Sequence, residues 1–165
     1  MRDAENAGKR YRPIRRAFAQ SGMPDREDLH NLSLLGKPGV RLPTSPEEAR
    51  LETFQNQRVG RRYWITLNCP EFSSLCPVTG QPDSARLVIR YVPGACCVET
   101  KSLKFYLASF RNQPAFNEEI VNRILDDLVK ALQPVEMIVR GDFAPRGGIQ
   151  LTTEATFPDS ISAKS

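Results

Sequence analysis

One loop of the sequence combines a thiol and a carboxylate, the pairing that covalent chemistry on an electrophilic carbon requires. Cys76 and Asp83 stand seven residues apart in a stretch that two prolines and a glycine constrain. A cysteine thiolate is the nucleophile, and a nearby carboxyl group can transfer the proton that the addition needs. Free cysteine titrates at about 8.5, so only about 3% is ionised at pH 7 unless the site stabilises the thiolate. Thr79 and the loop amides are available for that purpose. Taken alone, Cys76 can also be an ordinary loop cysteine.

Two further segments carry side chains that could meet a phosphate. Where a strand end meets a helix start, Thr100 is expected to cap the helix, with Lys101 and Lys104 on neighbouring positions. Arg146 precedes two glycines, the first of them Gly147, and glycine lets backbone approach an anion closely. Each segment also has a purely structural explanation: a solvated helix face in the first case, and a hairpin turn that needs glycine in the second.

Glu118 is a candidate for recognising a ring with a guanine-like edge. It lies in the first turn of a later helix, and its carboxylate could accept two hydrogen bonds from an N–H beside an NH₂ group. A carboxylate at this position also complements the helix dipole without any ligand. No G-x-G-x-x-G follows a predicted strand, so any dinucleotide would be bound outside a Rossmann fold.

The cysteine and histidine content argues against a metal site. The four cysteines include no C-x-x-C pair, and the single histidine, His30, lies in a polar N-terminal stretch. Adjacent Cys96 and Cys97 would point to opposite faces of a strand, so at least one is expected to be a small buried side chain. We therefore expect no metal ion, and we expect no disulfide in a cytosolic chain.

The composition is typical of a soluble globular domain. The chain has 165 residues, of which 40% are hydrophobic and 25% charged, enough for one domain with a moderate core. It has no apolar run of the roughly 20 residues that cross a bilayer and no apolar segment after its charged N-terminus, so we expect a cytoplasmic location without membrane association. The net charge of +4 comes from residues 1–16, which hold six basic and two acidic residues. Such a tail can attract nucleic acid, but a solvated extension is the favoured interpretation.

Hydrophobic periodicity predicts four strands and two helices. Alternation with a period of two indicates strands at 61–68, 85–92, 135–143 and 149–157. A period near four indicates helices that begin near Ser102 and at Asn117, a favourable cap residue, the second ending before Pro134. Their apolar stripes are Leu103, Tyr106, Leu107 and Phe110, then Ile120, Ile124, Leu128 and Ala131 or Leu132. Before them, 32–46 is expected to be an extended arm that ends in a short helix start at Pro46.

This order of elements predicts an α+β fold. A four-stranded antiparallel sheet with both helices on one face satisfies a ββααββ order. It leaves the other face of the sheet and both of its edges uncovered, which favours assembly with further subunits.

Four separated motifs together resemble one protein family. They are 72–83 (Phe-Ser-Ser-Leu-Cys-Pro-Val-Thr-Gly-Gln-Pro-Asp), 99–104 (Glu-Thr-Lys-Ser-Leu-Lys), 109–112 (Ser-Phe-Arg-Asn) and 145–149 (Pro-Arg-Gly-Gly-Ile). In this order and spacing they resemble the NADPH-dependent 7-cyano-7-deazaguanine reductases of queuosine biosynthesis, in their short single-module form. The resemblance implies a tunnelling fold (T-fold) of ββααββ units. It also implies a homo-oligomer, typically a decamer of two stacked five-membered rings, with active sites between subunits.

The resemblance also assigns roles to residues. Cys76 matches the nucleophile that attacks the nitrile carbon to form a covalent thioimide, and Asp83 matches the proton donor. Two molecules of NADPH would then reduce the thioimide to the amine of 7-aminomethyl-7-deazaguanine. By the same resemblance, the substrate contacts are Val98, Glu99, Thr100, Asn117 and Glu118. The cofactor contacts are Thr100, Lys101, Arg146 and Gly147.

The sequence departs from the family pattern in three places. Thr100 replaces the usual serine and keeps the hydroxyl. Asn117 stands where the family usually has histidine; it can donate a hydrogen bond but cannot carry a proton at neutral pH. The basic N-terminal extension has no counterpart in the short form. We expect residues 1–30 to form this extension, 31–158 the reductase domain and 159–165 a C-terminal tail.

Two other functions fit part of the sequence. An amidinotransferase that adds ammonia to nitrile-bearing tRNA uses the same thioimide step, and the basic tail would suit it, but that group lacks the Glu-x-Lys-Ser-Leu-Lys motif. A non-catalytic purine-binding T-fold protein is the other alternative. The intact Cys76 and Asp83 argue against it.

Overall fold

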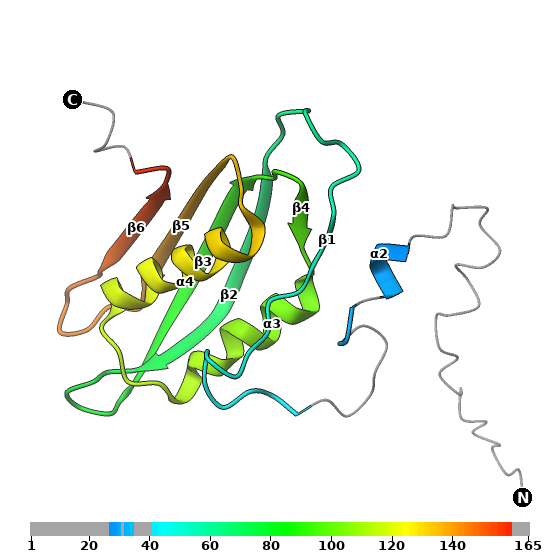
Figure 1. Ribbon diagram of the computed structural model, residues 1–165. Coiled ribbons are helices and arrows are strands. Elements are labelled where there is room, and N and C mark those ends of the chain that lie inside the picture. The colour runs from blue at the N-terminus through cyan, green and yellow to red at the C-terminus, as the bar shows by residue number, and fades with distance from the viewer. Residues whose placement is uncertain (1–26, 31, 35–40, 160–165) are drawn as a thin grey trace, which may run out of the picture.

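The computed structural model describes residues 27–30, 32–34 and 41–159 (Figure 1). A four-stranded antiparallel sheet has the order β2-β3-β5-β6, and a small second sheet pairs β1 with β4. The strands are β1 (Thr53–Gln55), β2 (Ile65–Leu75), β3 (Pro82–Val92), β4 (Cys96–Val98), β5 (Glu136–Phe143) and β6 (Thr152–Phe157). The helices are α2 (Glu27–His30), α3 (Thr100–Ala108), the 3₁₀ turn η1 (Ser109–Asn112) and α4 (Asn117–Leu132). The predicted α+β class and the four-stranded antiparallel sheet are confirmed.

The core lies between one face of the sheet and the helices α3 and α4, which both cover that face (Figure 1). Both predicted helix stripes are buried, and Leu132 rather than Ala131 completes the second. Along β3 every second residue is buried, beginning with Asp83 and followed by Ala85, Leu87 and Ile89. Asp83 therefore occupies a core-facing position at the end of an apolar row.

The first two long strands extend further toward each other than the periodicity predicts. Leu75 at the end of β2 pairs with Pro82 at the start of β3, so Asp83, which we expected on a loop, belongs to a strand. The register of β2 shifts between Cys69 and Phe72. This β-bulge contains Pro70, a residue tolerated there because the edge strand needs no N–H at that point.

Three other local predictions differ from the structure. Pro46 begins only a turn, closed by hydrogen bonds from Glu48 N to Ser45 O and from Ala49 N to Pro46 O. The last strand begins only at Thr152, because Ile149 closes the preceding turn with Arg146 and 150–151 connect that turn to the strand. The β1–β4 pair was not predicted, since strands of three residues are too short to show a period.

Only part of the predicted N-terminal extension, 1–30, lies within the described residues. Residues 1–26 and 160–165, and with them the basic segment, lie outside them. Residues 27–30 form the single helical turn α2, and Leu32 beyond it is buried. In the part of the chain that the structure describes, no helix is long and apolar enough to span a membrane.

Candidate active site

The turn between β2 and β3 holds Cys76 in a closed hydrogen-bonded ring. Cys76 N donates to Gln81 O at 2.8 Å, and Gly80 N donates to Cys76 O at 2.9 Å. Gly80 has a φ of 68°, in the left-handed region that favours glycine. The sequence Pro-Val-Thr-Gly thereby presents the half-buried thiol at the end of a rigid hairpin.

Hydrogen bonds lower the pKa of the Cys76 thiol to about 7. The Thr79 hydroxyl makes the largest contribution, followed by the amides of Thr79 and Val78, and Arg146 adds a smaller one. About half of such a thiol is ionised at pH 7. Burial instead raises the pKa of the Cys69 and Cys96 thiols. The loop that the sequence singles out thus carries a reactive thiol.

Asp83 lies beside this turn as a buried, ion-paired carboxylate. It is 7% exposed, and its Oδ1 atom is 2.8 Å from Arg146 Nη2. Its cross-strand partner is Ser74, whose hydroxyl is fully buried and has no hydrogen-bond partner among the described residues. The carboxylate, the thiol turn and an arginine from a distant part of the chain therefore form one cluster.

The turn between β5 and β6 brings Arg146 to this cluster. Arg146 and Ile149 exchange two backbone hydrogen bonds, of 2.9 and 3.0 Å, around Gly147 and Gly148. These glycines have φ values of 56° and 81°, the positive values that a type I′ turn requires and glycine tolerates. The Arg146 guanidinium also donates to Pro82 O at 2.8 Å and to Gln81 O at 3.4 Å.

The start of α4 lies at the same end of the molecule as Cys76. Leu75 N donates to Gln113 O at 3.1 Å, and Ala115 N donates to Leu75 O at 3.2 Å, which fixes the segment before the helix against the end of β2. Glu118 in the first helical turn is exposed.

Phe116, and not Asn117, is the N-cap residue of α4. The backbone N–H of Phe116 donates to Glu119 Oε2 at 3.2 Å. The prediction of an Asn117 cap is wrong because Asn117 is already the first helical residue. Its Oδ1 atom is buried without a hydrogen-bond partner in the described part of the chain.

The N-cap prediction at α3 is also wrong. Glu99, and not Thr100, caps the helix: its carboxylate accepts hydrogen bonds from Lys101 N at 2.8 Å and Ser102 N at 2.7 Å. Thr100 is exposed as the first helical residue. The Lys101 and Ser102 amides are therefore occupied by Glu99 and not available to an anion.

The predicted substrate and cofactor residues near α3 lie far from Cys76 within one chain. Val98 is buried, and its N–H donates to the Tyr91 hydroxyl at 3.2 Å. Lys101 Nζ donates to the carbonyl of Leu34. Tyr91 stands eight residues beyond Asp83 on β3, a distance of about 26 Å along an extended strand. In Figure 1 the β2–β3 and β5–β6 turns lie at the lower left, whereas β4 and the start of α3 lie toward the opposite end.

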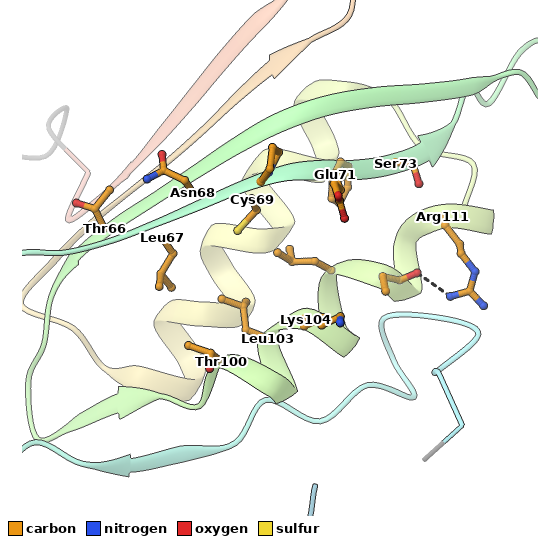
Figure 2. A pocket seen from close by; sticks show the side chains of 14 residues that line it. Thr66, Leu67, Asn68, Cys69, Glu71, Ser73, Thr100, Leu103, Lys104 and Arg111 are labelled. Carbon is orange, nitrogen blue, oxygen red and sulfur yellow. Dashed lines mark hydrogen bonds between the residues drawn. The ribbon is translucent and has the colours of Figure 1, made fainter. Parts of the chain in front are cut away.

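A groove of about 720 Å³ runs between β2 and α3 (Figure 2). Its walls are residues 66–73 of β2 and one side of α3 and η1, from Thr100 to Arg111. Lys104 and Arg111 bring positive charge, and Glu71 negative charge, to a lining whose surface is otherwise mainly apolar. Arg111 Nη1 donates to Ala108 O at 3.0 Å. Cys76 is three residues beyond Ser73, the last β2 residue of the wall, and so about 10 Å further along. Sequence reasoning missed this groove because it depends on how α3 lies against the edge strand.

Comparisons with known proteins agree with the motifs. Residues 82–160 match the family model described as "QueF-like protein". The chain is 52% identical over 127 residues to an NADPH-dependent 7-cyano-7-deazaguanine reductase of Porphyromonas gingivalis, covering 76% of this chain and 81% of the relative. It is 54% identical over 114 residues to the enzyme of that name from Anaeromyxobacter sp., covering 69% and 93%.

A solved structure shares the fold at much lower identity. The archaeosine synthase QueF-Like, crystallised in the apo form, superposes with a TM-score of 0.53 at 20% identity, over 56% of this chain and 91% of the other. This likeness supports the T-fold alone. The sequence relatives decide the family: the chain belongs to the NADPH-dependent 7-cyano-7-deazaguanine reductases.

Proposed function

We propose that this protein reduces the nitrile of 7-cyano-7-deazaguanine to the amine of 7-aminomethyl-7-deazaguanine with NADPH, in queuosine biosynthesis. The observation that carries the proposal is the Cys76 thiol, whose pKa is about 7, beside the buried Asp83 carboxylate. The relatives named for this reaction, at 52% and 54% identity, support the choice of substrate and cofactor.

Cys76 and Asp83 supply what a nitrile needs in order to be activated. The Asp83 carboxylate accepts the proton that Cys76 releases, and attack of the thiolate on the nitrile carbon then forms a C–S bond and leaves negative charge on nitrogen. Asp83 then passes that proton to the nitrogen and is again the carboxylate paired with Arg146, so the net step adds S–H across the C≡N bond and gives a thioimide. A thiol of lowered pKa is also a good leaving group, so Cys76 can depart once the carbon has been reduced.

The chain offers positive and hydroxyl groups for a phosphate-bearing cofactor. Lys104 and Arg111 line the groove beside Thr100, a donor set that fits a dinucleotide with an apolar ring system. We infer that Thr100 and Lys101 hold the cofactor from this side, and Arg146 and Gly147 from the side of Cys76. Each bound NADPH would supply one hydride, so two would be needed per nitrile: one for the thioimide carbon and one for the imine that remains after Cys76 has left.

The placement of the residues supports an active site shared between two copies. Val98, Glu99 and Thr100 lie at the opposite end of β3 from Cys76, so the site cannot close within one chain. Both β2 and β6 are edge strands of the four-stranded sheet. Three large apolar side chains near Cys76 are exposed: Val78 (78%), Phe116 (53%) and Ile149 (75%). We propose that a neighbouring subunit covers them and contributes its α3 start and Glu99, in stacked five-membered rings.

The proposal is tested by following NADPH absorbance with the nitrile as the limiting reagent. We expect two NADPH to be consumed for each nitrile, with the aminomethyl product formed, and no consumption by Cys76→Ala. An amidinotransferase would instead incorporate ammonia without loss of NADPH. Wild-type protein that leaves NADPH unchanged in the presence of the nitrile would refute the proposed reaction.

A further inference from the structure

The Arg146 guanidinium connects the separate parts of the Cys76 cluster. Its Nη2 atom lies 2.8 Å from Asp83 Oδ1 and 2.8 Å from Pro82 O, at the start of β3. It lies 3.4 Å from Gln81 O, the carbonyl that also closes the turn by accepting from Cys76 N. Arg146 also helps to lower the pKa of the Cys76 thiol. One guanidinium nitrogen thus contacts the carboxylate and two backbone carbonyls of the segment that leads from Cys76 to Asp83.

The backbone holds this guanidinium in place. The two hydrogen bonds between Arg146 and Ile149 fix the turn, and Ala144 N donates to Ser84 O at 2.9 Å, which attaches the turn to β3 next to Asp83. The Arg146 side chain is 41% exposed and the Asp83 side chain 9% exposed. The Arg146–Asp83 pair is therefore partly shielded from solvent. A charge pair in such a position interacts more strongly than one on an open surface.

Within the described residues, Arg146 supplies the positive charge beside Cys76 and Asp83. The turn 77–82 and the segment 113–117 contain no charged residue. The nearest acidic residues on α4, Glu118 and Glu119, are both exposed, and Glu119 accepts from Phe116 N. Without Arg146, the buried carboxylate would lie beside the thiol without a counter-charge, and an unpaired negative charge disfavours a second one nearby.

We propose that Arg146 is a positioning residue for the reaction at Cys76: it orients the Asp83 carboxylate and, by neutralising it, allows the sulfur to ionise beside it. In catalysis this role rests on the proposed function, but the ionisation of Cys76 can be measured without substrate. The role is distinct from the cofactor contact that the family resemblance implies for Arg146.

The test measures the alkylation rate of Cys76 by iodoacetamide against pH in the full-length protein, with the Cys76 peptide quantified by mass spectrometry. In wild type we expect the rate to rise through about pH 7. Arg146→Gln should move the midpoint up by one pH unit or more, which lowers the rate at pH 7 about fivefold. Asp83→Asn should move the midpoint down, and the Arg146→Gln/Asp83→Asn double variant should return close to wild type. Arg146→Lys should cause a smaller shift than Arg146→Gln, because an ammonium keeps the positive charge but is compact and more strongly hydrated.

Arg140→Gln serves as the matched control. Arg140 also pairs with an aspartate, Asp142, at 3.0 Å, but on the exposed surface of β5, and its loss should leave the Cys76 midpoint unchanged. Thermal melts establish that each variant is folded.

The outcomes separate this proposal from the proposed function. An unchanged Cys76 midpoint in Arg146→Gln, with only the KM for NADPH raised, would overturn the positioning role in favour of a cofactor contact. A shifted midpoint that Asp83→Asn reverses supports the positioning role, even if the wild-type protein does not reduce the nitrile and the proposed function fails.

Discussion

The reactivity of Cys76 is a property of its immediate neighbours in sequence. Thr79 and the amides of a six-residue turn point at the sulfur, because Gly80 allows the turn to close. These neighbours are local, so the sequence alone could predict them. The Asp83–Arg146 pair could not be predicted in this way, since its members stand 63 positions apart. They meet only through the register of β3 and β5, in which Ala85 pairs with Phe143.

Replacing Thr79 by valine should raise the pKa of the Cys76 thiol, because its hydroxyl is the largest stabiliser of the thiolate. The thiolate is the form present above the pKa, so the alkylation rate at pH 7 should fall, about fivefold for a rise of one unit. The pH profile of iodoacetamide alkylation measures this change. Thr66→Val, on the exposed side of β2, is the matched control and should leave the profile unchanged. A wild-type profile in Thr79→Val would show that other donors govern the thiol.

Among the helices and strands, the long segments could be predicted from hydrophobic periodicity, but the residues at which they begin and end could not. The stripes of α3 and α4 span two or more helical turns and are buried as expected. The two N-cap predictions were wrong because a cap depends on a single side chain. At α3, Glu99 reaches the amides that Thr100 was expected to cap. The β1–β4 pair offers only three residues per strand, so its pairing depends on contacts distant in sequence.

Gly141 on β5 sets how closely α4 can approach the sheet. A Cβ atom there would lie 2.9 Å from Val121 Cγ2 and 2.9 Å from Phe143 Cε2. Gly141→Ala should therefore destabilise the protein by about 1–3 kcal/mol, the usual cost of overpacking a core, as measured by urea unfolding. The penalty should be smaller in a Val121→Ala background, since the contacting methyl group is gone. Equal penalties in both backgrounds would show that Val121 does not limit the approach.

Across the described chain, the residues proposed for the active site form two groups, or proposed half-sites, at opposite ends of one sheet. The sequence motifs identified both groups of residues, but linear order says nothing about whether they meet within a chain. The length of β3, which separates Asp83 from the Tyr91–Val98 contact, indicates that they do not. We therefore propose that a complete site requires a second copy, in line with the uncovered edges of β2 and β6.

Two inactive variants should complement each other if the site is shared. Cys76→Ala and Lys101→Ala damage different half-sites, and hybrid rings from an equal mixture, refolded or co-expressed together, should regain about a quarter of the wild-type reductase activity by random assortment. Each variant alone is the control. Hybrid assemblies that stay inactive, with mixing verified by differently tagged chains, would place the whole site within one subunit.

The proposed reaction requires Cys76 to bond covalently to a nitrile carbon, and intact-protein mass spectrometry detects such a bond. With 7-cyano-7-deazaguanine and no NADPH, we predict that the mass of each chain rises by the full mass of the nitrile. The increment should map to the peptide that contains Cys76, and Cys76→Ala should not show it. An unchanged mass at saturating nitrile, or an increment on Cys69 or Cys96 in place of Cys76, would contradict the account.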